Sequence, residues 1–144
     1  MILLDTTILV YAVGADHALR DPCLQLVEWV ASGSVRATTT LEAIQEFTHI
    51  RAVRRTRADA AALGRNYAIG LSPLAQPELD DLLEGLELYR RTPSLGSFDA
   101  VMAVTARRRG WSLASADRGF ARVTGLLHLN PASASFLTSV RAAG

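Results

Sequence analysis

Residues 1–12 read MILLDTTILVYA, and this stretch determines how the rest of the chain is interpreted. Residues 1–5 form an apolar run that ends at Asp5, which predicts a short buried strand. The following residues, 7–13, predict a short helix that stops at Gly14. An acid at the end of a buried strand must find hydrogen-bond donors or a cation, so Asp5 is the first candidate functional residue.

Helical and strand patterns alternate along the remaining sequence. We predict helices from the Asp21-Pro22 cap to about Ala31, from Thr40 to about Arg55, over residues 57–69, from Pro77 to about Arg90, from Ser97 to Gly110 and from Asn130-Pro131 onward. Further strands are predicted at residues 35–39, 111–115 and 126–129. This alternation predicts an α/β fold, with one domain over residues 1–144 and a mostly parallel central sheet flanked by helices.

Composition excludes several classes of protein. No apolar run approaches the length that spans a bilayer, and the first segment lacks the basic start of a signal peptide. The single cysteine, Cys23, excludes an internal disulfide and fits a reducing cytoplasm, where we expect it to be buried filler. All 15 basic residues are arginine. A P-loop needs a lysine, and receiver domains and haloacid-dehalogenase-type phosphatases normally use one, so these phosphate chemistries are disfavoured.

Acidic residues recur where an α/β sheet gathers functional groups. Asp5 and Asp117 each end an apolar run, Asp99 opens a helical pattern, and Glu46 lies in the helix that follows the second strand. Because strand ends and the following helix starts lie at one edge of such a sheet, these acids are predicted to converge. A group of carboxylates suits a hard divalent cation such as Mg²⁺ or Mn²⁺.

Each acid also has an ordinary structural interpretation. Asp5 alone can be a polar strand terminus. A first-turn acid such as Asp99 is favoured by the helix dipole, by about 0.3–1 kcal/mol. Asp117 precedes a glycine-containing turn, and Glu46 with Glu42 can form a solvated helix face. The functional interpretation rests on their combination.

Four motifs in order make the chain resemble the PIN-domain nucleases, and among them the VapC-type toxins of bacterial toxin–antitoxin pairs. The motifs are LDTTILVYA at residues 4–12, LEAIQEF at 41–47, SFDA at 97–100 and LASADRGF at 113–120. The resemblance implies a PIN domain with Asp5, Glu46, Asp99 and Asp117 as its acidic quartet. It implies that Asp5, Asp99 and Asp117 bind metal, with Thr7 and Ser115 in support. Thr7 stands where many relatives carry Asn, and Gly119 where some carry a further acid.

The resemblance also implies a function. We expect a Mg²⁺-dependent endoribonuclease toxin, with Mn²⁺ as a substitute metal, that cleaves structured RNA such as tRNA or ribosomal RNA in the cytoplasm. We also expect a cognate VapB-like antitoxin that neutralises it, and a homodimer. Candidate phosphate-binding residues are Arg51, Arg54, Arg55 and Arg57. Two alternatives remain: a PIN-type nuclease of RNA processing or repair without an antitoxin, and a domain that binds RNA or protein without cleavage.

Overall fold

The centre of the molecule is a four-stranded sheet in which all strands are parallel. The computed structural model describes residues 1–144. The strands are β1 (Ile2–Leu4), β2 (Ala37–Thr38), β3 (Ser112–Ala114) and β4 (His128–Leu129), in the spatial order β2-β1-β3-β4. Strand β1 pairs with β3 along its whole length. The predicted α/β class with a parallel sheet is confirmed, although the strands are shorter than the sequence pattern indicated.

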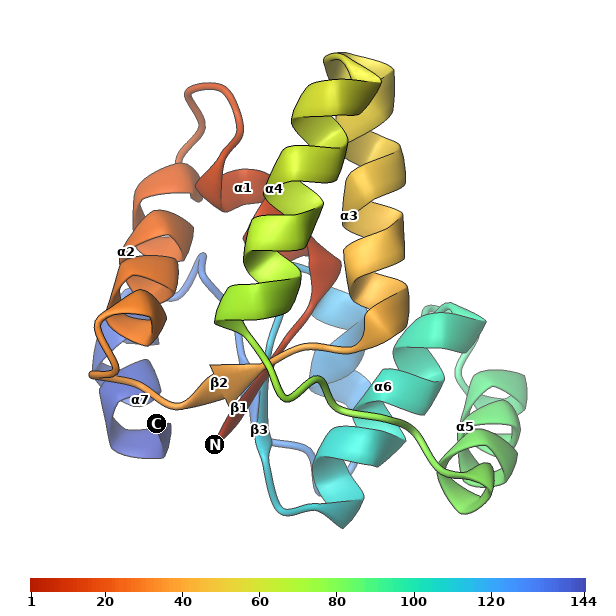
Figure 1. Cartoon of the computed structure of the whole chain (residues 1–144). Helices are drawn as coiled ribbons and strands as arrows, with labels where there is room; N and C mark the ends of the chain where they lie inside the picture. The colour runs from red at the N-terminus through yellow and green to blue at the C-terminus, as the bar shows by residue number, and fades with distance from the viewer.

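Helices cover both faces of this sheet (Figure 1). They are α1 (Thr6–Ala12), α2 (Arg20–Ala31), α3 (Leu41–Arg54), α4 (Arg57–Gly70), α5 (Leu79–Arg91), α6 (Ser97–Arg108) and α7 (Phe136–Ala143), with a 3-10 helix η1 (Arg118–Arg122). Helices α3 and α4 form a long hairpin on one side, and α5 and α6 lie together on the other. No helix is long and apolar enough to cross a membrane.

Two hydrophobic cores explain this layering. Along β1, Ile2 and Leu4 belong to the core shared with α1, α2, α3 and α7, whereas Leu3 belongs to the core shared with α6. Side chains of a strand alternate between its faces, so one strand fills both cores. All three residues are fully buried. Each contributes about 1.5–3 kcal/mol of transfer free energy, which fixes the position of the strand and therefore of Asp5 after it.

Helix α3 starts where the sequence predicted, and α6 starts differently. The hydroxyl of Thr40 accepts the Ala43 N–H at 3.2 Å, so Thr40 is the N-cap of α3. For the helix predicted from Ser97 to Gly110, the sequence pattern favours Ser97 as the N-cap, and this is wrong, because Gly96 is the N-cap of α6. Its N–H donates to the Asp99 carboxylate at 3.3 Å, which places Ser97 inside the helix and Asp99 in the first turn.

The structure also corrects the predicted starts of two other helices, α2 and α7. Helix α2 has Leu19 rather than Asp21 as its N-cap, and Pro22 lies in the first turn, where helical N–H groups have no intrahelical partner. Helix α7 begins at Phe136, several residues after Asn130. The Asn130 carboxamide oxygen accepts the N–H of Ala132 at 2.8 Å and so forms a local turn that competes with helix.

Cys23 is completely buried in the first of the two cores. Burial raises the pKa of its thiol to about 12. The thiolate is the reactive form of cysteine, so this residue is inert packing, as predicted.

Candidate active site

The acidic residues lie at the edge of the sheet where β1 and β3 end. The Asp5 N–H donates to the Ala114 carbonyl at 3.0 Å and so extends the β1–β3 pairing by one residue. This places Asp5 beside Ser115, the residue that follows β3. Asp99 enters from the first turn of α6, and Glu46 from the second turn of α3.

Asp5 is held through one of its two carboxylate oxygens. Its Oδ2 accepts hydrogen bonds from the Thr7 hydroxyl at 2.6 Å, the Thr7 N–H at 3.3 Å and the Ser115 hydroxyl at 2.7 Å. The residue is 4% exposed. Each of these hydroxyls has one hydrogen, which is used on Asp5, so each hydroxyl acts elsewhere as an acceptor. Both sequence-predicted supporting residues therefore contact Asp5 directly.

The same two hydroxyls also order the loop after β3. The Thr7 hydroxyl accepts the Ala116 N–H at 3.0 Å, and the Ser115 hydroxyl accepts the Asp117 N–H at 2.9 Å. Asp117 in turn accepts the Gly119 N–H at 2.7 Å through Oδ1 and is the N-cap of η1. The turn-forming interpretation of Asp117 is therefore correct, and it is compatible with a role in the site.

Glu46 is held by a residue that the sequence interpretation did not single out. The hydroxyl of Thr6 donates to Glu46 Oε2 at 2.6 Å and lies 3.4 Å from the Ala43 carbonyl oxygen. Thr6 is buried, whereas Glu46 is exposed. The only hint of this contact in the sequence is the pair of hydroxyl residues after Asp5. Successive residues of a helix point in different directions, so Thr6 and Thr7 can contact different acids.

The environment of Asp99 raises the pKa of its carboxyl group. Its pKa is raised to about 6, first by burial and then by the charges of Asp5, Asp117 and Glu46; the hydrogen bond from Gly96 partly opposes the rise. Three acids that are distant in the sequence thus act electrostatically on the fourth. The predicted convergence of Asp5, Glu46, Asp99 and Asp117 agrees with this arrangement.

All four acids share one pattern of hydrogen bonding. In each, protein donors bind one carboxylate oxygen and leave the other without an intramolecular partner; the bound atoms are Asp5 Oδ2, Glu46 Oε2, Asp99 Oδ2 and Asp117 Oδ1. None of the four takes part in an ion pair with an arginine or histidine. The negative charge is therefore not neutralised by the protein.

Carboxylate oxygens are the ligands preferred by Mg²⁺, so this donor set fits a hard divalent cation. As the side chains stand, no group of three or more acidic, histidine or cysteine residues is arranged to hold a metal ion. Enclosing one ion therefore requires side-chain rotation. The side chains of Asp99 and Asp117 each use only one oxygen on a single backbone N–H, which leaves them room to turn.

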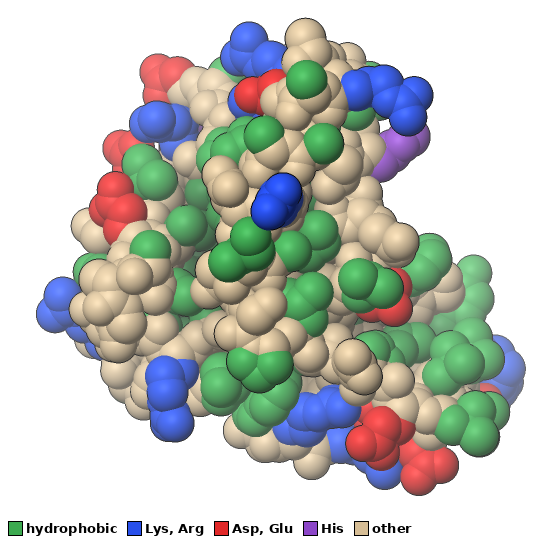
Figure 2. Space-filling view, in the orientation of Figure 1, with side chains coloured by type: hydrophobic (Ala, Val, Ile, Leu, Met, Phe, Trp, Pro, Cys, Tyr) green, Lys and Arg blue, Asp and Glu red, His purple; other side chains and the backbone are tan.

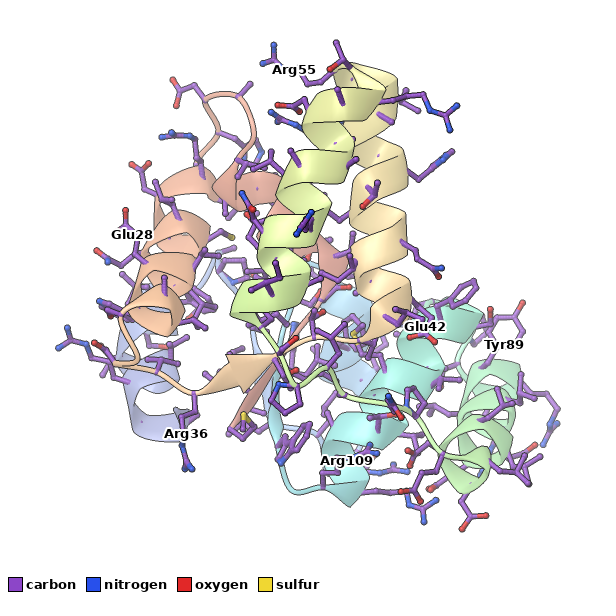
Figure 3. All side chains as sticks on the ribbon, in the orientation of Figure 1. Glu28, Arg36, Glu42, Arg55, Tyr89 and Arg109 are labelled. Atoms are coloured by element: carbon purple, nitrogen blue, oxygen red, sulfur yellow. The ribbon has the colours of Figure 1, made fainter.

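A groove of about 690 Å³ adjoins the acids. Asp5, Glu46 and Asp99 lie on its wall, together with apolar residues of α5 and α6. Figure 2 shows this side of the molecule hollowed between the α3–α4 hairpin and α5, with hydrophobic side chains gathered over α5. Glu42 also faces the groove (Figure 3), and its buried Oε2 has no hydrogen-bond partner. A volume of several hundred cubic ångströms suits an extended organic substrate.

The arginines divide into structural residues and unpaired residues. Arg51 donates to Asp59 at 2.5 Å and to the Val13 carbonyl at 3.0 Å, so it braces α3 against α4 and is not free for a phosphate. This pairing makes Arg51 less suited than its neighbours to the predicted role in RNA binding. Arg54, Arg55 and Arg57 are exposed and form no ion pair, and Arg55 projects at the tip of the hairpin (Figure 3).

Arginines at the end of α6 fix α5 in place. Arg109 and Arg108 pair with the buried carboxylate of Asp81 at 3.2 Å and 3.5 Å. The two helices touch closely, because a Cβ at Gly85 would lie 2.8 Å from the Cα of Val101. The α6 arginines are therefore structural, and they hold the α5 wall of the groove.

Comparison with known proteins agrees with the geometry. A model of the PIN domain family matches residues 2–126. This chain belongs to the PIN-domain family. The PIN domain here is 47% identical over 140 residues to Ribonuclease VapC7 of Mycobacterium tuberculosis, covering 96% of this chain and 97% of that protein.

Two further relatives support the VapC type. VapC ribonuclease Mb1869c of Mycobacterium bovis is 34% identical over 131 residues, covering 90% of this chain and 99% of that protein. Ribonuclease VapC23 of Mycobacterium tuberculosis is 31% identical over 112 residues, covering 76% of this chain and 86% of that protein. The PIN domain described here is thus of the VapC type along nearly its whole length.

Proposed function

We propose that this PIN domain is a Mg²⁺-dependent endoribonuclease, the toxin of a toxin–antitoxin pair. The observation that carries the proposal is the convergence of four acids with no protein cation beside them, three of which lie on the wall of a groove. Each acid has one carboxylate oxygen without a protein partner, so these oxygens remain available to a cation once the side chains rotate toward it. The relatives' names as VapC ribonucleases support the same activity.

Within this proposal, Asp5, Asp99 and Asp117 would hold the metal, and Glu46 would orient a water molecule. When bound, Mg²⁺ lowers the pKa of a coordinated water and stabilises the charge that develops on phosphate oxygens; Mn²⁺ is the substitute. Thr7 and Ser115 keep the Asp5 carboxylate from turning. Asp99 would bind a cation as the carboxylate, so protons compete with the metal for this side chain at low pH.

Binding of RNA needs positive charge away from the acids. Arg54, Arg55 and Arg57 provide it at the far end of the α3–α4 hairpin. Arg54 lies eight residues after Glu46 on α3, which is roughly 12 Å along a helix. A single strand spans that distance within a few nucleotides, so these arginines bind phosphates on one side of the scissile bond.

The substrate is proposed to be a structured RNA, such as tRNA or ribosomal RNA. Base edges are read best in unstacked loops, and the groove beside the acids suits such a segment. The alternative of an RNA-processing nuclease without an antitoxin is distinguished by the neighbouring gene: a small DNA-binding protein encoded just upstream favours the toxin.

Two protein partners follow from the proposal. One is a VapB-like antitoxin, which neutralises the toxin in the cytoplasm. The other is a second copy of the chain, supported by an exposed apolar face on α5: Leu79, Leu82, Leu83, Leu86 and Tyr89 are between 43% and 68% exposed. These positions recur on one side of the helix, and such a face is typical of a protein interface. Leu79, Leu82 and Leu86 also line the groove, so a second copy on this face would border the groove that receives RNA.

The deciding experiment is cleavage of total cellular RNA by the purified protein and by Asp99→Asn, each with Mg²⁺, Mn²⁺ or EDTA. Discrete fragments that require metal and disappear in the variant are expected, and mapping their ends identifies the target. The control is Arg36→Gln, which alters an exposed residue on another part of the surface. This variant should cleave RNA normally. Binding of RNA without cleavage under every condition would favour the non-cleaving alternative.

A further inference from the structure

Thr6 occupies an unusual position between two helices of the site. It is the first residue of α1, it is 3% exposed, and its hydroxyl reaches Glu46 on α3 at 2.6 Å. This separation lies in the range of a hydroxyl that donates to a carboxylate. We propose that Thr6 is a positioning residue for the reaction and acts through Glu46.

The direction of the bond decides which partner is held. Thr6 is fixed by its backbone in a buried turn, whereas Glu46 is exposed and carries a long side chain. Glu46 has no other hydrogen bond and no ion pair. Thr6 is therefore the only protein group that holds this carboxylate by a hydrogen bond, and it leaves Oε1 without a protein partner.

The hydroxyl has an alternative partner that makes the idea testable. The Ala43 carbonyl oxygen lies 3.4 Å away, and a hydroxyl has one hydrogen to donate. When Glu46 is absent, Thr6 turns to Ala43 and stays satisfied. Removing the hydroxyl should consequently disturb Glu46 while the contact between α1 and α3 persists through their apolar residues.

Adjacent residues thus serve different acids. Thr7 binds Asp5, and Thr6 binds Glu46. The Asp5-Thr6-Thr7 tripeptide contributes one acid of the site and orients a second, because consecutive helical side chains point about 100° apart. This inference rests on the proposed nuclease function.

The test compares Thr6→Val, which keeps the shape and removes the hydroxyl, with Thr6→Ser, which keeps the hydroxyl. Both are measured alone and in a Glu46→Ala background, as kcat and KM on a cleavable RNA and as Mn²⁺ affinity by calorimetry. Loss of a residue that orients a ligand typically costs about 10–100-fold in activity or metal affinity. We expect Thr6→Val to lower kcat or Mn²⁺ affinity by that factor with KM for RNA unchanged, and Thr6→Ser to restore most of it.

The double variant separates positioning from general structure. If Thr6 acts through Glu46, Thr6→Val causes no further loss once Glu46 is alanine. Thr105→Val is the matched control, because Thr105 is fully buried in α6 and its hydroxyl has no partner. It should leave kcat, Mn²⁺ affinity and Tm close to those of the unmodified protein or raise Tm.

Three results would overturn the inference: Thr6→Val unchanged in both kcat and Mn²⁺ affinity, a loss that persists in the Glu46→Ala background, or no rescue by Thr6→Ser. Failure of the proposed function looks different. A protein that binds Mn²⁺ without cleaving RNA refutes the nuclease, and with it the reaction that Thr6 would position. A protein that neither binds Mn²⁺ nor cleaves refutes both.

Discussion

Asp99→Asn is expected to stabilise the metal-free protein at neutral pH. The variant removes a charge that burial and the carboxylates of Asp5, Asp117 and Glu46 disfavour, while Asn can still accept the Gly96 N–H. The pKa of Asp99 rises from 3.8 to about 6. At about 1.4 kcal/mol per unit, the ionised carboxylate costs at most about 3 kcal/mol of folding free energy.

The sign of this effect depends on pH. Since the pKa is raised in the folded state, the folded protein binds this proton more tightly than the unfolded chain between about pH 4 and pH 6, and its stability falls as pH rises through that window. Asn does not titrate. The advantage of Asp99→Asn should therefore be near zero below about pH 4, grow up to about pH 6, and stay constant above it.

Thermal unfolding in EDTA across this pH range measures the effect. A gain of about 1–3 kcal/mol corresponds to roughly 3–9 °C in Tm for a chain of this size. Asp80→Asn is the control, because Asp80 is also a first-turn acid but is exposed. Added Mg²⁺ should raise Tm of the unmodified protein and narrow the difference. A pH-independent difference, or an Asp99→Asn protein that is less stable at neutral pH, would refute the electrostatic account.

Three other outcomes are expected. The double variant Arg54→Ala/Arg55→Ala should bind RNA more weakly. In titrations at several salt concentrations, the slope of log affinity against log salt should fall by about one per lost phosphate contact; an unchanged slope contradicts the role of these arginines. Ser115→Ala should lower kcat by about 10–100-fold with near-normal folding, because Asp5 loses a donor; full activity would show that Thr7 suffices. Leu83→Glu, on the exposed face of α5, should convert a dimer to a monomer in light scattering; an unchanged dimer places the interface elsewhere.

The fold could be predicted from the sequence because the spacing of apolar residues indicates which side chains are buried. The apolar residues of β1 fill two cores by alternation, and the acids after β1 and β3 meet because neighbouring parallel strands end together. Helix starts were predicted less well. At α6 the Asp99 carboxylate accepts the N–H of Gly96, so Gly96 rather than Ser97 is the N-cap. A capping rule based on residue type favours serine and does not predict this.

Roles that depend on packing between helices were not accessible from the sequence. Arg51 looks like its exposed neighbours in a run of arginines, yet it is the one that reaches Asp59 across the α3–α4 hairpin. Thr6 looks like a helix-capping hydroxyl, and only the crossing of α1 and α3 brings it to Glu46. In both cases the partner lies on another helix, so the spacing of residues along one helix gives no indication of it.

The way each acid is held explains how a partly buried cluster of negative charges can exist before a cation arrives. Donors from the protein, namely hydroxyl groups and backbone N–H groups, bind one oxygen of each carboxylate and compensate part of its lost hydration. They carry no positive charge, so they orient the acids without neutralising them. An arginine in the same place would stabilise the protein more and would occupy the oxygens that a metal needs. Burial, together with the charges of the other three acids, raises the pKa of Asp99, and this is the electrostatic cost of keeping four oxygens available.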